Sequence, residues 1–186
     1  MPTRMERRQE RVQRCRREAL AWIIELTVVF VLAMLVRTYV FSLTSVQGPS
    51  MLETLHSNQV VAVDKLYYRL NRFARGQVVI CRYPNSSEYY VKRIIALPGE
   101  TLEICGGKTL INGQELEEGY VRYAAQEDFG PVSVGKDEVF VMGDNRANSY
   151  DSRQEGALDA NMIVGRVVAV CLPVWEARWL PEHIAD

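Results

Sequence analysis

The chain is poor in the residues that most often build metal and redox sites. It contains two histidines, His56 and His183, and four cysteines that form no Cys-x-x-Cys pair. A His-rich metal site, a zinc ribbon and a thioredoxin-type motif are therefore excluded, and we expect no metal and no cofactor. The net charge is only −1, which argues against a strongly basic protein that binds nucleic acid. With 48% hydrophobic and 24% charged residues, the composition is that of a globular protein.

The charge that is present is distributed unevenly along the chain. Residues 1–18 contain seven arginines and three glutamates, whereas residues 19–36 are apolar apart from Glu25. A helix of 18 residues is about 27 Å long, close to the ~30 Å hydrocarbon core of a bilayer. We therefore predict a basic N-terminus over 1–18 and a transmembrane anchor over 19–39. The alternatives are a buried helix of a soluble protein and a cleaved signal peptide, which usually has a shorter apolar stretch and a small-residue cleavage site.

The orientation of this anchor follows from the positions of the basic residues. After the apolar stretch comes Arg37, and the next basic residue is Lys65. Positive charge collects on the cytoplasmic side of a membrane, so the N-terminus is expected in the cytoplasm and residues 40–186 outside it. The next longest apolar stretch, 164–174, is interrupted by glycine, arginine and proline and is predicted to be a strand.

The part of the chain that follows the anchor has the pattern of a β-rich domain. Glycines and an Asn-Gly pair at 106–107 and 112–113 predict two successive hairpin turns. Short helices are expected only over 64–73 and at the extreme C-terminus. We predict a mainly β fold, an antiparallel sheet domain over 40–186 with a small hairpin subdomain around 100–135. Runs rich in Val, Ile and Tyr predict strands at 60–63, 77–82, 89–95, 139–142 and 166–171.

Two residue types in this domain have open roles. Cys15 lies on the predicted cytoplasmic side, and the other cysteines, Cys81, Cys105 and Cys171, are expected to be small buried hydrophobic residues. Trp175 and Trp179 fit either the membrane interface or the packing of the core.

Three segments carry residues suited to catalysis, although each alone has an ordinary explanation. Ser50 follows Gly48 and Pro49, where a serine is usually a turn residue. Lys92 lies between Tyr90 and Ile94 on one face of a predicted strand, where burial of its ammonium would be costly. The segment 143–153 is dense in Asp, Asn and Arg but does not match a calcium-binding loop.

Taken together, these segments resemble the bacterial type I signal peptidases, membrane-anchored serine proteases with a Ser–Lys dyad. The resemblance covers most of the chain, and the single anchor is similar to the Gram-positive branch. It implies the antiparallel β-sheet catalytic domain of that family. The motifs are Gly-x-Ser-Met at 48–51, Arg-Gly-x-Val-Val-x-x-Arg-Tyr-Pro at 75–84, Lys-Arg-x-x-x-Leu-Pro-Gly at 92–99 and Gly-Asp-Asn-Arg-x-x-Ser-x-Asp-Ser-Arg at 143–153.

The resemblance also implies roles for individual residues. Ser50 matches the nucleophile, Lys92 the general base, and Ser149 the residue whose hydroxyl orients the lysine. Gly48 stands where one branch has a serine that donates to the oxyanion, whereas the Gram-positive branch commonly has glycine. The remaining matches are an ion pair between Asp151 and Arg153 and two further charged positions, Asp144 and Arg146.

The implied chemistry sets conditions on the environment of the lysine. Lys92 can act as a base only when neutral, so its pKa must fall from about 10.4 toward ~7–8. Burial against Tyr90 and Ile94 would supply that shift if Asp151 pairs with Arg153 instead of Lys92. The backbone N–H of Ser50 would then hold the oxyanion.

The implied substrates are secreted preproteins, cut after small residues at the end of the signal peptide, and the chain is expected to act as a monomer in the lipid bilayer. Two alternatives stay open at this point. One is a self-cleaving Ser–Lys protease of the SOS-repressor type, and the other is a membrane-tethered relative that binds preproteins without cutting them.

Overall fold

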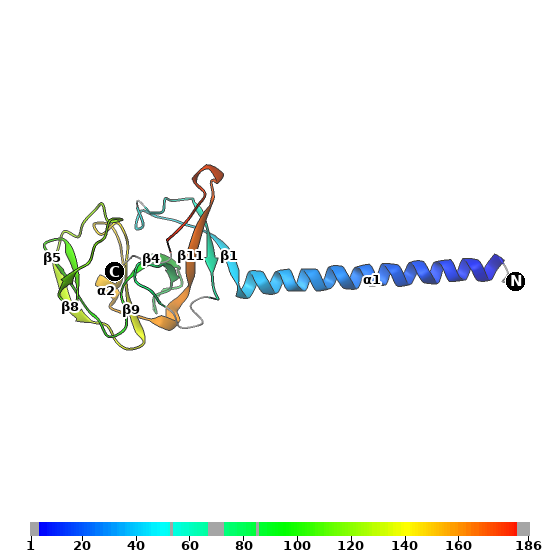
Figure 1. Ribbon diagram of the computed structural model, residues 1–186, viewed down its shortest axis with the longest axis horizontal. Coiled ribbons are helices and arrows are strands. Elements are labelled where there is room, and N and C mark those ends of the chain that lie inside the picture. Colours follow the sequence, from blue (N-terminus) through cyan, green and yellow to red (C-terminus); the bar gives the residue numbers. More distant parts are fainter. Residues whose placement is uncertain (1–3, 53, 67–72, 85, 182–186) are drawn as a thin grey trace. The chain divides into compact units, whose positions relative to one another are not determined.

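The computed structural model describes residues 4–52, 54–66, 73–84 and 86–181, with side chains from residue 13 onward except that of Cys15. The chain divides into two compact units, Met1–Val40 and Phe41–Asp186. The first is a single helix and the second holds all the described strands (Figure 1).

Helix α1 extends over Arg4–Tyr39 and is therefore longer than the predicted anchor, because it continues through the basic N-terminal residues. This range contains no Gly or Pro, and its Arg, Glu and Gln residues favour helix. Among the described residues, the part of this helix over Arg16–Tyr39 is long and apolar enough to cross a membrane. Its large apolar side chains from Leu20 to Val36 are roughly half exposed or more, a surface suited to lipid.

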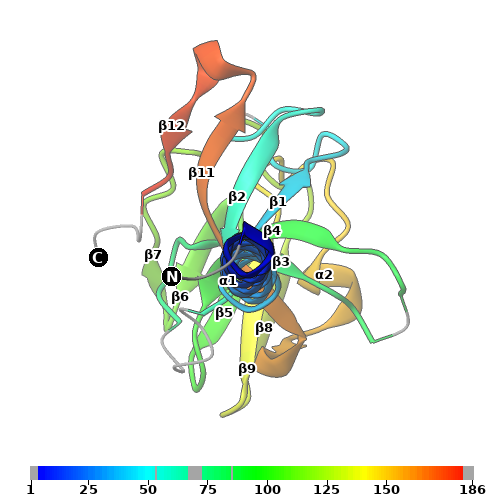
Figure 2. The same ribbon diagram turned by 90° about the vertical axis from the view of Figure 1, so that its right-hand side faces the viewer.

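The second unit is built on a larger antiparallel sheet. Its order is β1-β2-β11-β3-β4-β9-β10, and β12 pairs with β11. Figure 2 shows β1, β2, β11 and β12 side by side. The predicted antiparallel β-sheet fold is thus confirmed. The strands are β1 (Phe41–Ser45), β2 (Val60–Asp64), β3 (Val78–Cys81), β4 (Tyr90–Ala96), β9 (Glu138–Met142), β10 (Leu158–Asp159), β11 (Ile163–Leu172) and β12 (Arg178–Trp179).

A smaller sheet of four strands forms from the segment between β4 and β9, in the order β7-β6-β5-β8. The expected hairpin turns are present, because β5 pairs with β6 and β6 with β7. The turn residues at 106, 107, 112 and 113 all have positive φ, as a tight two-residue hairpin requires. The strands are β5 (Thr101–Cys105), β6 (Lys108–Ile111), β7 (Gln114–Glu115) and β8 (Phe129–Ser133).

Strand β4 lies at the centre of the core, between β3 and β9. Its residues reach three clusters of buried apolar side chains: Val91 packs on the first, Ile94 belongs to the second and Ile95 to the third. Both faces of the strand are therefore covered. As a result, the two consecutive charged residues of β4, Lys92 and Arg93, are both buried.

Some local expectations differ from the structure. Asp64 ends strand β2, and most of the helix expected over 64–73 lies outside the described residues, as does 182–186. The short helix expected at the extreme C-terminus thus stays a prediction, and before residues 182–186 a 3-10 turn, η3 (Val174–Glu176), leads into β12. A short helix that the sequence pattern did not indicate, α2 (Ser152–Glu155), begins within the last residues of the 143–153 segment, and a 3-10 turn, η2 (Ala160–Met162), precedes β11.

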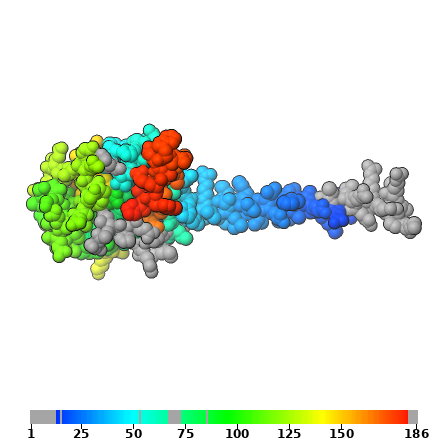
Figure 3. Space-filling view, turned by 45° about the horizontal axis from the view of Figure 1, so that its top comes forward, coloured from blue at the N-terminus to red at the C-terminus, as the bar shows by residue number. Residues whose placement is uncertain are grey.

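The cysteines and tryptophans of the second unit also differ in their exposure to solvent. Cys81 is buried as expected, whereas Cys105 is exposed and Cys171 is half-buried. Trp175 and Trp179 are 85% and 81% exposed, so the interpretation that they pack in the core is wrong. The segment that carries them is red in Figure 3 and lies at the surface of the second unit.

Candidate active site

Ser50 lies in a tight turn between β1 and β2. The turn is closed by the Leu52 N–H, which donates to the Pro49 carbonyl over 3.2 Å. Met51 and Leu55 anchor the turn, because both side chains are buried in the first apolar cluster. Gly48 has a positive φ of 87°, a backbone conformation that glycine adopts without strain. The serine itself is half-buried and remains accessible from solvent.

Lys92 projects from β4 into an environment that disfavours its charged form. The side chain is 2% exposed, and its Nζ donates to the Ser149 hydroxyl over 3.1 Å. The ring of Tyr90 lies 5.9 Å from Nζ, measured to its centroid. Desolvation by burial lowers the pKa of Lys92 below its ordinary value, and it outweighs the opposing attraction of Asp151.

Asp151 ties the two ends of the 143–153 loop together. One carboxylate oxygen accepts from the Gly143 N–H over 3.0 Å, and the carboxylate also receives two guanidinium N–H groups of Arg153 at 2.9 Å. The same side chain caps helix α2. Burial acts to raise the pKa of Asp151, but the hydrogen bonds and charge of Arg153 prevail and hold this pKa below its usual range. The charge of Asp151 is thus matched by Arg153.

Gly143 is the point where the loop meets the serine turn. A Cβ at this position would lie 2.5 Å from the Ser50 carbonyl oxygen and would overlap both side-chain atoms of Ser149. Since Ser149 is hydrogen-bonded to Lys92, the absence of a side chain at 143 allows the serine turn and the lysine's partner to converge.

Asp144 holds Arg93, a buried arginine of the site. Arg93 donates from Nε and Nη2 to the two carboxylate oxygens of Asp144, over 2.8 and 2.6 Å. The Thr54 hydroxyl also donates to Asp144, over 2.5 Å, which links the ion pair to the segment after Ser50. A bidentate pair of this kind fixes both partners in orientation as well as distance.

Arg146 connects the loop to the smaller sheet. Its guanidinium donates to both carboxylate oxygens of Glu118 and, over 2.9 Å, to the hydroxyl of Thr109 on β6. Although burial acts to raise it, the pKa of Glu118 is lowered by Arg146. The phenol of Tyr120 donates to Glu118, and its ring lies 4.0 Å from the Arg93 guanidinium carbon.

The structure therefore brings the residues singled out from the sequence into one neighbourhood, with Gly48 in the serine turn. Sequence reasoning missed Thr54, Glu118, Tyr120 and Asn145. Asn145 had a signal, because it lies inside the motif at 143–153, but Glu118 and Tyr120 belong to a segment with no motif. Within the described part of the chain, no three His, Cys, Asp or Glu side chains are grouped so that they could hold a metal ion.

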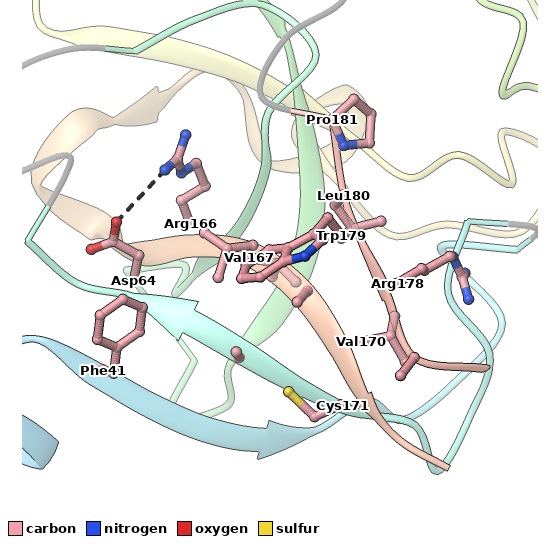
Figure 4. Close-up of a pocket in the computed structure, with 14 residues that line it drawn as sticks. Phe41, Asp64, Arg166, Val167, Val170, Cys171, Arg178, Trp179, Leu180 and Pro181 are labelled. Carbon is pink, nitrogen blue, oxygen red and sulfur yellow. Dashed lines mark ion pairs between the residues drawn. The ribbon is translucent and has the colours of Figure 1, made fainter. Parts of the chain in front are cut away.

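A separate hollow of about 860 Å³ lies over β2, β11 and β12 (Figure 4). Its lining is mostly apolar, with Val170 and Trp179 among its walls, and an ion pair of 3.6 Å joins Arg166 to Asp64 at one end. Neither Ser50 nor Lys92 lines it. This hollow and the candidate catalytic residues are therefore different places in the fold.

The second unit contains a buried ion pair, Asp151 with Arg153, and an exposed one, Lys108 with Glu115, and they should differ in their contribution to stability. Arg153→Ala should lower the free energy of unfolding by about 3 kcal/mol, because it leaves the buried Asp151 carboxylate without its guanidinium. Lys108→Ala, which breaks the exposed pair of Lys108 with Glu115, should change it by less than about 0.5 kcal/mol. Urea unfolding of the two variants beside the wild type measures the difference.

The same comparison has an expected pH dependence. A carboxyl whose pKa is lowered on folding stabilises the protein at neutral pH, and this stabilisation is lost as the pH falls below about 4. The difference in the free energy of unfolding between the wild type and Arg153→Ala should therefore become smaller in acid. Equal losses from the two variants at pH 7 would contradict the assignment of a buried pair.

Comparison with known proteins extends these observations beyond the site. A sequence profile of the family described as signal peptidase, peptidase S26, matches residues 19–172. The chain is 40% identical over 152 residues to signal peptidase I of Leptolyngbya laminosa, which covers 77% of this chain and 75% of that protein. It is 38% identical over 170 residues to signal peptidase I of Bacillus amyloliquefaciens, with 86% and 91% covered.

Further similarity is found to signal peptidase I S of Bacillus subtilis strain 168, at 37% identity over 175 residues, covering 88% of this chain and 94% of the relative. A crystal structure of a signal peptidase I from Enterococcus faecalis overlaps with a TM-score of 0.47 at 28% identity, covering 52% of this chain and 97% of the other. Because the family profile spans most of the chain and these relatives are similar over three quarters or more of their length, the chain belongs to the signal peptidase family, peptidase S26.

Proposed function

We propose that the chain is a membrane-anchored serine endopeptidase that removes signal peptides from exported preproteins with a Ser50–Lys92 dyad. Membership of the signal peptidase family supports a peptidase that cleaves signal peptides. The single observation that carries the dyad is the desolvated amine of Lys92, whose hydrogen-bond partner is a hydroxyl, beside the turn of Ser50. A neutral amine in this position can accept a proton.

The reaction then follows the usual course of nucleophilic acyl transfer. Ser50 Oγ attacks the scissile carbonyl carbon while its proton passes to the neutral Nζ of Lys92. When the C–N bond breaks, the ammonium of Lys92 returns this proton to the leaving amine. Water, deprotonated by the same amine, then attacks the acyl-enzyme, and proton transfer back to Ser50 Oγ releases the signal peptide's new carboxyl end.

Ser149 supports the lysine in both of its charge states. Its hydroxyl accepts a hydrogen bond from Nζ over 3.1 Å, so the amine's lone pair is free to be directed toward Ser50. The ion pairs of Asp151 with Arg153 and of Asp144 with Arg93 direct the nearby carboxylates to guanidinium groups. Lys92 therefore keeps the lowered pKa that a general base needs near neutral pH.

The substrate would bind as an extended chain. A peptide added along the strands near Ser50 and Lys92 presents alternate side chains to the protein, and family resemblance favours small residues at these positions. The helix α1 would hold the enzyme in the membrane, with its arginine-rich end in the cytoplasm and the second unit outside. We expect the enzyme to act as a monomer.

Ser50→Ala and Lys92→Met should each lower the rate of preprotein cleavage by about 10⁴-fold or more, because nucleophile and base act as a unit. Matched controls are Ser133→Ala and Lys136→Met, which alter a serine and a lysine at exposed positions and should leave the rate unchanged. The measurement is conversion of a purified preprotein by the full-length enzyme in detergent or vesicles. Substantial cleavage by Lys92→Met would reject the dyad.

The lowered pKa of Lys92 predicts the direction of the pH profile. Only the neutral amine is active, so kcat/KM should rise with pH and reach its plateau well below the ordinary lysine value of 10.5. At pH values between the pKa of Lys92 in the folded protein and its pKa in the unfolded chain, only the unfolded chain binds a proton at this amine. The free energy of unfolding contributed by Lys92 therefore also rises with pH over this range. The free energy of unfolding of Lys92→Met, measured at several pH values, should lack this rise. A wild-type activity profile that rises only near pH 10.5 would contradict a desolvated base.

The proposed topology can be tested with single-cysteine variants. A thiol reagent that cannot cross membranes, added to intact protoplasts, should label Cys105, whose side chain is exposed in the second unit, and should spare Cys15. Protease added outside should likewise digest residues beyond 40. Labelling of Cys15 together with protection of Cys105 would show the reverse orientation.

A further inference from the structure

Asn145 contacts the serine turn through two separate atoms. Its backbone N–H donates to the Ser50 carbonyl over 3.0 Å, and its side-chain Nδ2 donates to the Pro49 carbonyl over 3.3 Å. Its Oδ1 accepts from the Asn148 N–H over 3.2 Å, which holds the amide in the orientation that points Nδ2 at the turn. The residue is 7% exposed, so these contacts are made away from bulk water.

The second of these contacts fixes one particular peptide group. The Pro49 carbonyl and the Ser50 N–H belong to the same planar peptide unit, which is trans. In a trans peptide the C=O and N–H bonds point in opposite directions. A donor that holds the Pro49 carbonyl on one side of the C–N bond therefore directs the Ser50 N–H to the opposite side of that bond.

This peptide matters more in this chain because position 48 is glycine. Gly48 has no side chain that could donate to an oxyanion, so the Ser50 N–H bears a larger share of that task in the proposed reaction. A hydrogen bond accepted by a peptide carbonyl also polarises the same peptide's N–H and strengthens it as a donor.

Resting on the proposed function, we infer that Asn145 is a positioning residue of the oxyanion site. Its side-chain amide orients and polarises the Pro49–Ser50 peptide, whose N–H stabilises the negative oxygen of the tetrahedral intermediate. The Leu52 N–H also donates to the Pro49 carbonyl, so the Asn145 amide adds to an existing bond and its removal should weaken the site without abolishing it.

The side-chain contribution can be separated from the folding of the loop. Any substitution at 145 keeps the backbone N–H that donates to Ser50, so Asn145→Ala removes only the bonds of the amide. Asn145→Asp has nearly the same shape and keeps an acceptor for Asn148, but it places an oxygen against the Pro49 carbonyl. The matched control is Asn148→Ala, which removes an exposed amide from the same loop and keeps its backbone N–H.

The experiment measures full-length enzyme in detergent on a preprotein, with thermal melts to verify folding. Asn145→Ala should lower the plateau kcat about tenfold with KM unchanged, because an oxyanion donor acts in the transition state and not in the bound substrate. Asn145→Asp should lower it further, and Asn148→Ala should match the wild type. The pH at which Asn145→Ala reaches half of its plateau should not move, because the surroundings of Lys92 are unaltered.

A second readout reports directly on the oxyanion site. A peptide aldehyde ending in alanine adds to Ser50 Oγ, with the serine proton passing to the aldehyde oxygen or to Lys92, and places this oxygen where the oxyanion forms. Its affinity should fall about tenfold in Asn145→Ala, in parallel with kcat. A structural defect in substrate binding would instead raise KM and the dissociation constant of the aldehyde together and leave kcat unchanged.

Unchanged kcat and aldehyde affinity in folded Asn145→Ala and Asn145→Asp would overturn the inference. So would a rise in KM alone, or a shifted pH profile in Asn145→Ala. The proposed function fails separately, by cleavage that persists in Ser50→Ala, and that result does not depend on any variant at position 145.

Discussion

Lys92 is buried in the second unit with a hydroxyl as its hydrogen-bond partner and, among the described residues, without a carboxylate in an ion pair with it, and much of the candidate site is arranged around that constraint. Asp151 and Asp144 both act to raise the pKa of Lys92, which would favour its charged form. Each of these carboxylates is held instead by an arginine, Arg153 in one case and Arg93 in the other. Desolvation therefore dominates at Lys92, and the cost of burying several charges is offset by pairing all of them except the amine.

The sheet supplies the geometry that this arrangement needs. Strand β4 is covered on both faces, so it can place Lys92 and Arg93 in different buried surroundings only one residue apart. The loop after β9 lies next to β4 because these strands pair. The smaller sheet contributes through the bond between Glu118 and Arg146, which ties a segment without any motif to the loop. The candidate site thus depends on contacts from both sheets of the unit.

The fold class, most strands, the hairpin turns and the family could be predicted from the sequence, because strand runs, turn residues and motifs are local patterns. Long-range partnerships such as Thr54 with Asp144 and Glu118 with Arg146 have no local signature and appear only when the strands are paired. Strand alternation placed Lys92 on one face of β4 but could not show that the opposite face is buried too. The length of α1 was underestimated, because charged residues that favour helix extend it beyond the apolar stretch. The catalytic roles of the residues that the fold brings together in the candidate site stay predictions.

Gly143 gives the site an unusual genetic sensitivity. The residue has no functional group, yet a Cβ there would meet the Ser50 carbonyl and the Ser149 side chain. All four glycine codons share their first two bases, so every missense change of one base in such a codon introduces a side chain with a Cβ. We therefore expect substitutions at this position to be poorly tolerated, because the place of a Cβ is already taken by the Ser50 carbonyl and the Ser149 side chain. A mutational survey that scored positions by tolerance alone would rank Gly143 with Ser50 and Lys92 and would misread a requirement of packing as one of chemistry.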